Sequence, residues 1–185
     1  PSVRFLVPSI LVEGMSILSG APKAGKSALM LHVCLSIASG DSALGSLPVS
    51  QGEVLYLALE DSDRRMQARC RDLLDGQPIP RDFTYITKVP KGDIVKTIHA
   101  WLQRHPDTSL IVLDTLGRVM PPAERGETTY ERDYRVGELL KGVSDDRGGL
   151  AIVVVHHTRK AASDDFVASS SGTNGLAGSA DTITV

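Results

Sequence analysis

The chain contains the stretch Gly20-Ala-Pro-Lys-Ala-Gly-Lys26-Ser27, and this stretch decides its fold. A phosphate-binding loop needs converging backbone amides, glycines that allow a tight turn, and a lysine that reaches the outer phosphates. Gly20, Gly25 and Lys26 meet these needs, and the Ser27 hydroxyl stands where such loops bind Mg²⁺. We expect ATP to contact the following run of residues: Gly20, Ala21, Pro22, Lys23, Ala24, Gly25, Lys26, Ser27 and Ala28.

The sequence on either side of the loop supports this interpretation. A string of this kind can also arise by chance, as a loop followed by a helix cap. Here the apolar run at residues 14–19 predicts a strand, and residues 27–39 carry apolar side chains at helical spacing before Gly40. A strand that enters the loop and a helix that leaves it are typical of a functional phosphate loop.

The rest of the chain alternates between predicted strands and helices. Apolar runs predict strands at residues 53–59, 83–86, 110–114 and 150–155. Helical patterns and caps predict helices at residues 62–74, 94–104 and 131–143. This alternation indicates an α/β domain with a mostly parallel sheet, helices on both faces, and ligands at the carboxyl ends of the strands.

Composition narrows the class of protein. The 185 residues fit one domain spanning 1–185, and the net charge of -2 gives no bulk attraction to nucleic acid or anionic membrane. Any nucleic-acid contact must therefore come from a local patch. We interpret Cys34 and Cys70 as small apolar residues in a reducing cytoplasm, and no apolar run approaches the ~20 residues needed to span a bilayer. Since the chain begins at Pro1 and stops at Val185 inside a β-like run, we expect a domain truncated at its C-terminus.

Two acidic residues follow different predicted strands. Asp114 ends the strand at residues 110–114, where P-loop enzymes place the carboxylate that supports the metal. Glu60 follows the strand at residues 53–59 and could activate the attacking water as a general base. The neighbouring Asp61 is the weaker candidate, and either acid could instead cap the next helix. That helix carries Arg64, Arg65, Arg69 and Arg71, which we interpret as a solvated face.

A pair of histidines follows the strand at residues 150–155. A neutral imidazole at His157 could contact the third phosphate, while His156 would point to the other face of the sheet. The pair could also belong to a metal site or be structural, although no third ligand is obvious. We expect His157 to sense the phosphate.

Taken in order, these motifs resemble the RecA-like ATPases of plasmid and phage replication, often called RepA-like, and more distantly the DnaB-type ring helicases. The resemblance covers nearly the whole chain. It rests on residues 20–27, 57–61, 111–116, 156–160 and 172–181. It implies that Lys26 and Ser27 bind phosphate and Mg²⁺, that Glu60 polarises water, and that Asp114 supports the metal. It also implies that His157 reports on the third phosphate.

The resemblance further implies partners. Members of this group commonly form hexameric rings that bind ATP between neighbours and single-stranded DNA in the central channel. The corresponding channel loops would contain Arg118, Arg125, Arg159 and Lys160. One departure concerns the arginine that neighbouring subunits supply to the site. No lysine or arginine follows Lys160, and Asp181 stands near one position of that arginine with the opposite charge.

Three functions are compatible with these features. The first is a Mg²⁺-dependent ATPase that drives a DNA replication helicase. The second is a replication or recombination regulator that binds DNA under ATP control without unwinding it. The third is a small-molecule phosphotransferase, which the pairing of Glu60 with Asp114 fits less well than water activation.

Overall fold

The computed structural model describes residues 3–157 and 174–185. In this part of the chain, six strands form a parallel sheet in the order β5-β4-β6-β7-β3-β8. The strands are β3 (Gly14–Gly20), β4 (Glu53–Ala58), β5 (Phe83–Ile86), β6 (Thr108–Asp114), β7 (Ala151–His157) and β8 (Thr182–Thr184). A separate antiparallel pair is formed by β1 (Phe5–Val7) and β2 (Leu11–Val12).

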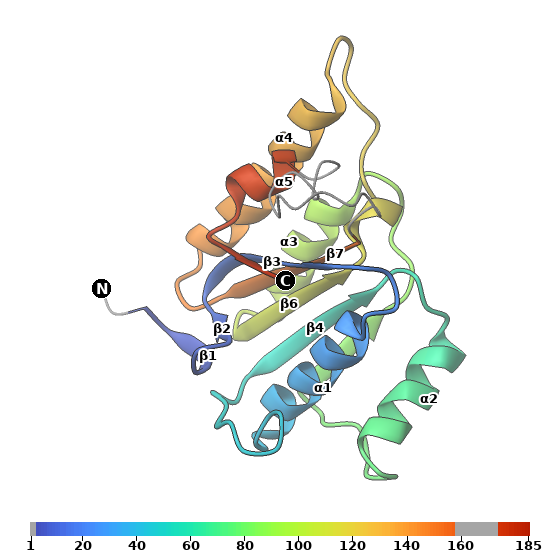
Figure 1. Cartoon of the computed structure of the whole chain (residues 1–185), viewed down its shortest axis with the longest axis vertical. Coiled ribbons are helices and arrows are strands. Elements are labelled where there is room, and N and C mark those ends of the chain that lie inside the picture. Colours follow the sequence, from blue (N-terminus) through green and yellow to red (C-terminus); the bar gives the residue numbers. More distant parts are fainter. Residues whose placement is uncertain (1–2, 158–173) are drawn as a thin grey trace.

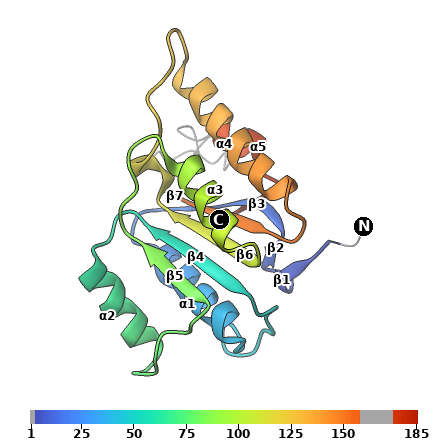
Figure 2. The ribbon, with the colours of Figure 1, turned by 180° about the vertical axis from the view of Figure 1, so that it is seen from behind.

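Helices cover both faces of the sheet, as Figures 1 and 2 show. They are α1 (Lys26–Ser39), α2 (Asp63–Leu73), α3 (Ile94–Arg104), the 3₁₀ helix η1 (Leu116–Arg118), α4 (Thr129–Asp145) and α5 (Asn174–Ser179). Helices α1 and α2 pack on one face, and α3, α4 and α5 pack on the other. The predicted α/β fold with a parallel sheet and helices on both faces is therefore confirmed.

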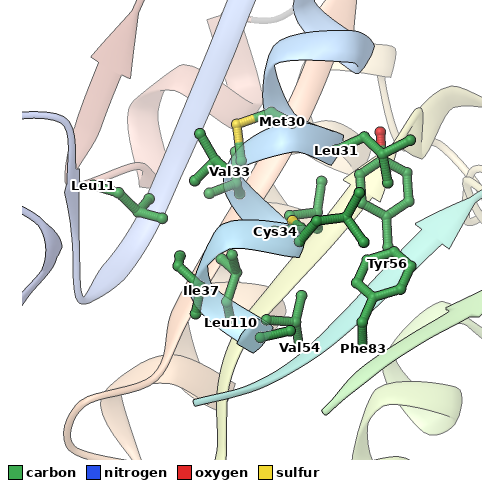
Figure 3. Close-up of a cluster of buried hydrophobic side chains, with 14 of the residues drawn as sticks. Leu11, Met30, Leu31, Val33, Cys34, Ile37, Val54, Tyr56, Phe83 and Leu110 are labelled. Atoms are coloured by element: carbon green, nitrogen blue, oxygen red, sulfur yellow. The ribbon is translucent and has the colours of Figure 1, made fainter. Parts of the chain in front are cut away.

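Burial on both faces explains why the central strands are almost wholly apolar. Along β4, Val54 and Tyr56 face α1, whereas Leu55 and Leu57 face α3 and α4. Figure 3 shows the first of these cores, in which side chains of α1 lie over the strands. Both cysteines are buried and free in this core, as expected for small apolar residues.

Local sequence signals set several helix ends. The Ser62 hydroxyl accepts a hydrogen bond from the Arg65 amide and starts α2, and Gly40 ends α1 with φ 82°. Helix α4 begins two residues before the predicted start, because Thr128 and Glu131 form a reciprocal capping box. The β1–β2 pair and α5 were not predicted.

The strand order brings the predicted site residues to one edge of the sheet. Strands β4, β6, β7 and β3 are successive neighbours, and the carboxyl ends of parallel strands meet at the same edge. Asp114 and His157 are the last residues of β6 and β7, Glu60 lies two residues after the end of β4, and the phosphate loop follows β3. Within residues 3–157 and 174–185, no helix is long and apolar enough to cross a membrane.

The contact between β4 and β6 yields a test of the fold. A Cβ atom on Gly52, the residue before β4, would lie 2.8 Å from Cβ of Ser109 on β6 and closer still to its Oγ. We expect Gly52→Ala to lower the free energy of unfolding by about 1–3 kcal/mol, as is typical of overpacking, when measured by chemical denaturation.

The matched control is Gly142→Ala, because a Cβ atom on this glycine of α4 meets nothing within 4 Å. That change should be neutral or stabilise by up to about 1 kcal/mol, the usual gain of alanine over glycine in a helix. Adding Ser109→Gly to Gly52→Ala should recover part of the loss. An equal response of Gly52→Ala and Gly142→Ala would contradict the close approach of β4 and β6.

Candidate active site

The phosphate loop connects β3 to α1 in a conformation suited to bind an anion. Lys23 and Gly25 have left-handed backbones, with φ 64° and φ 91°, and such residues turn successive amides toward a common concavity. Gly25 is also the N-cap of α1, and no side chain in the described part of the chain caps the helix there. The first amides of α1 are therefore free to bind phosphate oxygens.

Lys26 is held at the centre of this loop. Its side chain is buried, and the ammonium donates hydrogen bonds of 2.8 Å to the carbonyls of Gly20 and Ala21. Burial lowers the pKa of Lys26, while the Asp114 and Glu60 carboxylates oppose that shift. The ammonium could exchange these neutral carbonyl partners for the charged oxygens of a phosphate, which are stronger acceptors.

A cleft of about 240 Å³ opens over the loop. Its walls are residues 23–28 together with Arg69 of α2 and His157 of β7. His157 reaches the cleft because it lies in register with Gly20 on the neighbouring strand. His156 lines a different cleft, of about 500 Å³, and burial followed by the adjacent His157 lowers its pKa. The two histidine side chains therefore line different clefts, as the alternation of side chains along a strand predicts.

Glu60 and Asp61 have contrasting surroundings. The Glu60 carboxylate accepts a hydrogen bond of 2.9 Å from the Thr115 hydroxyl and lies 3.5 Å from Nε2 of His157. Its side chain is 41% exposed, whereas that of Asp61 is 11% exposed and pairs with Arg65 and Arg69. Since both oxygens of Asp61 are engaged by arginines, the geometry favours Glu60 as the carboxylate that can accept a proton from water.

Asp114 is buried and is held by Tyr56, a residue that was not predicted to belong to the site. The Tyr56 hydroxyl donates a hydrogen bond of 2.6 Å to Oδ2 of Asp114 and lies 3.4 Å from the carbonyl oxygen of Ser27. Burial, followed by the Asp114 charge, raises the pKa of Tyr56 well above its ordinary value. In Figure 3, the Tyr56 hydroxyl points along α1 toward the end that carries Met30. The available sequence signal was a hydroxyl inside an otherwise apolar strand.

These surroundings fit a magnesium ion. The Ser27 hydroxyl and Oδ1 of Asp114 have no hydrogen-bond partner among the described residues. The same residues contain no cluster of three or more His, Cys, Asp or Glu side chains suited to a metal. Mg²⁺ commonly takes only one or two oxygens from a P-loop protein and the others from water and phosphates. Ser27 and Asp114 would hold the ion in this way.

Two of the residues predicted to contact nucleic acid, Arg118 and Arg125, lie in the described part of the chain, and neither lines the phosphate cleft. Arg118 ends η1 and Arg125 lies in the loop before α4, both exposed to solvent. Arg159 and Lys160 lie outside the described residues. The prediction that the arginines of α2 form only a solvated face is wrong for Arg69. Its side chain is 24% exposed and turns toward Asp61 and the cleft.

Asp181 has a structural role far from the phosphate loop. Its carboxylate accepts a hydrogen bond of 2.9 Å from the Met15 amide, at the amino end of β3, and pairs with Lys141 of α4. The phosphate loop follows the opposite end of β3. Asp181 thus anchors β8 and α4 to the sheet, which accounts for an acid at this position.

Comparison with known protein families gives a match over most of the chain. A family model described as an AAA domain matches residues 1–163. No curated protein matches the chain. The match includes the phosphate loop and the ends of β4, β6 and β7.

The hydrogen bond between Tyr56 and Asp114 yields a prediction about stability. Tyr56→Phe leaves Oδ2 of a buried carboxylate without its donor. Since a hydrogen bond to a charged group contributes about 1.5–3 kcal/mol, we expect a loss of this size in chemical denaturation.

Tyr130→Phe serves as the control, because Tyr130 is 53% exposed and its hydroxyl donates no hydrogen bond within the described part of the chain. This change should alter the free energy of unfolding by less than about 0.5 kcal/mol. Equal stability of the two variants would show that the Tyr56 hydroxyl does not hold Asp114.

Proposed function

The chain belongs to the AAA-domain family of P-loop NTPases, which bind and hydrolyse nucleoside triphosphates, and from this premise we propose a Mg²⁺-dependent ATPase that drives a DNA replication helicase. The observation that carries the ATPase proposal is the position of Glu60. Its carboxylate lies beside the phosphate loop, next to His157, and has no arginine to neutralise it among the described residues. A carboxylate in this position suits water activation better than transfer to a second substrate.

The site residues divide the reaction between them. The loop amides and Lys26 bind the phosphates, while Ser27 and Asp114 would hold Mg²⁺, which would neutralise charge on the phosphate oxygens. Glu60 accepts a proton as the water oxygen forms a bond to the terminal phosphorus and the bond to the bridging oxygen breaks. His157 lies between the loop and Glu60, where it can contact the terminal phosphate.

The helicase proposal rests on the loops that follow the same strands. Arg118 and Arg125 follow β6, and Arg159 and Lys160 follow β7, so the segments that carry them begin at the catalytic edge of the sheet. Such loops can link nucleotide state to a polymer. We propose that they contact single-stranded DNA in the channel of a homohexameric ring, in the cytoplasm. This proposal is supported by the order of the motifs along the chain.

The ATPase proposal is tested by Glu60→Gln and Lys26→Ala. We expect Glu60→Gln to bind ATP normally and to lower turnover by about 10²-fold or more, because it removes the general base and keeps the pocket. Lys26→Ala should lose tight ATP binding, because the loop amides alone cannot replace the charge-assisted bonds of the ammonium. Equilibrium binding and phosphate release measure the two effects.

Glu138→Gln and Lys96→Ala are the charge-matched controls, since both residues are exposed and distant from the cleft. Neither control should change binding or turnover. Normal turnover by Glu60→Gln, combined with loss of turnover by Asp61→Asn, would show that Asp61 and not Glu60 is the general base. Unchanged ATP affinity in Lys26→Ala would show that this loop is not the nucleotide site.

The DNA proposal is tested on the loop after β7. Arg159→Ala with Lys160→Ala should weaken binding to single-stranded DNA, reduce the slope of its salt dependence by roughly one to two, and abolish stimulation of ATP hydrolysis by DNA. Basal hydrolysis should remain nearly intact. Arg64→Ala with Arg71→Ala removes the same charge from the exposed side of α2 and should leave DNA binding unchanged.

Two results would count against the helicase proposal. Wild-type DNA affinity, salt slope and stimulation in the Arg159 and Lys160 variant would show that this loop does not contact DNA. DNA-dependent ATP hydrolysis without displacement of a paired strand would instead identify a regulator that binds DNA under ATP control.

A further inference from the structure

Arg69 is the one arginine of α2 that lines the phosphate cleft. Ser62 caps α2, and Arg69 lies two turns further along, on the side that faces the phosphate loop. Its side chain is 24% exposed, whereas that of Arg65, one turn earlier, is 66% exposed. Arg64 and Arg71 are also exposed to solvent. The orientation of Arg69 therefore differs from that of its neighbours on the same helix.

Asp61 holds the guanidinium of Arg69 at the edge of the cleft. Nη1 of Arg69 donates to Oδ2 of Asp61, and the other carboxylate oxygen accepts from Arg65 at 3.2 Å. A guanidinium carries five N–H donors in a planar fork, so the bond to Asp61 leaves most of them available. Asp61 thus fixes the direction of the guanidinium, and the remaining N–H donors of Arg69 can still bind an anion.

The charges around the cleft favour an anionic ligand beside Arg69. The loop presents backbone amides and the Lys26 ammonium, and Lys23 lies on the same wall. The carboxylates of Glu60 and Asp114 do not line this cleft, and they have hydroxyl partners on Thr115 and Tyr56. A planar guanidinium can bind phosphate oxygens in a bidentate manner, which an ammonium cannot do.

We propose that Arg69 binds the phosphate chain of the nucleotide from the α2 side, as a cationic contact supplied by the same subunit and held in place by Asp61. This inference rests on the proposed ATPase function, because it names a further residue of the same site. Since Asp61 directly follows Glu60, the contact also ties the phosphates to the segment that carries the general base. Arg69 is therefore a phosphate-binding residue of this site.

The test measures dissociation constants for ATP, ADP, AMP and adenosine with the intact chain. Arg69→Gln should raise the constant for ATP and ADP roughly 10- to 100-fold, the usual effect of a charge-assisted hydrogen bond. It should leave adenosine binding unchanged and flatten the dependence of ATP affinity on salt. Arg69→Lys keeps the charge without the fork and should give an intermediate loss for ATP.

Arg65→Gln is the matched control, because it breaks the other ion pair of Asp61 without touching the cleft. It should change ATP affinity less than about 2-fold, as expected of an exposed pair. Thermal unfolding shows whether each variant is folded. If Arg69→Gln does not fold, the comparison of Arg69→Lys with the unaltered chain tests the inference. An equal effect of Arg65→Gln and Arg69→Gln would overturn the inference, as would an equal loss of affinity for adenosine and ATP.

The outcomes separate this inference from the proposed function. If the unaltered chain does not bind ATP, both proposals are overturned. If the unaltered chain binds ATP, Lys26→Ala does not, and both Arg69 variants bind normally, the nucleotide site stands and the role of Arg69 is overturned.

Discussion

Parallel pairing of β4, β6, β7 and β3 is the constraint on which the site depends. Because these four strands run in the same direction, the segments that leave them meet at one edge of the sheet. The register of the strands places site residues side by side, since His157 pairs with Gly20 and Asp114 pairs with Ala58. Helices packed on both faces hold the strands in this register, so the reactive groups are positioned by the core and not by the loops alone.

The charged groups of Lys26, Glu60 and Asp114 at this edge each have a hydrogen-bond partner. Hydroxyl groups of Tyr56 and Thr115 donate to Asp114 and Glu60, and main-chain carbonyls accept from Lys26. A buried charge without such partners would be strongly destabilising. These hydroxyl and carbonyl partners are neutral, whereas Asp61 is neutralised by its two arginines.

Elements with a strong local signal could be predicted from the sequence. Unbroken apolar runs predicted the central strands, and the cap residues Ser62 and Gly40 predicted helix ends that the structure confirms. The β1–β2 pair and α5 carry no such signal, because they contain only two to six residues each. Short elements are stabilised mainly by tertiary contacts, such as the burial of Leu176 of α5 against α4.

The phosphate loop and the acids after the strands could be predicted from short stretches of sequence, because their requirements for glycine, lysine and an apolar run are local. The surroundings of these residues depend on contacts between distant parts of the chain, so they follow from the folded structure alone. Tyr56 and Asp114 are 58 positions apart, and only the neighbouring positions of β4 and β6 bring them into contact. Likewise, Asp61 and Arg69 gain their roles from the direction in which α2 leaves the sheet, which sets which side chains face the cleft.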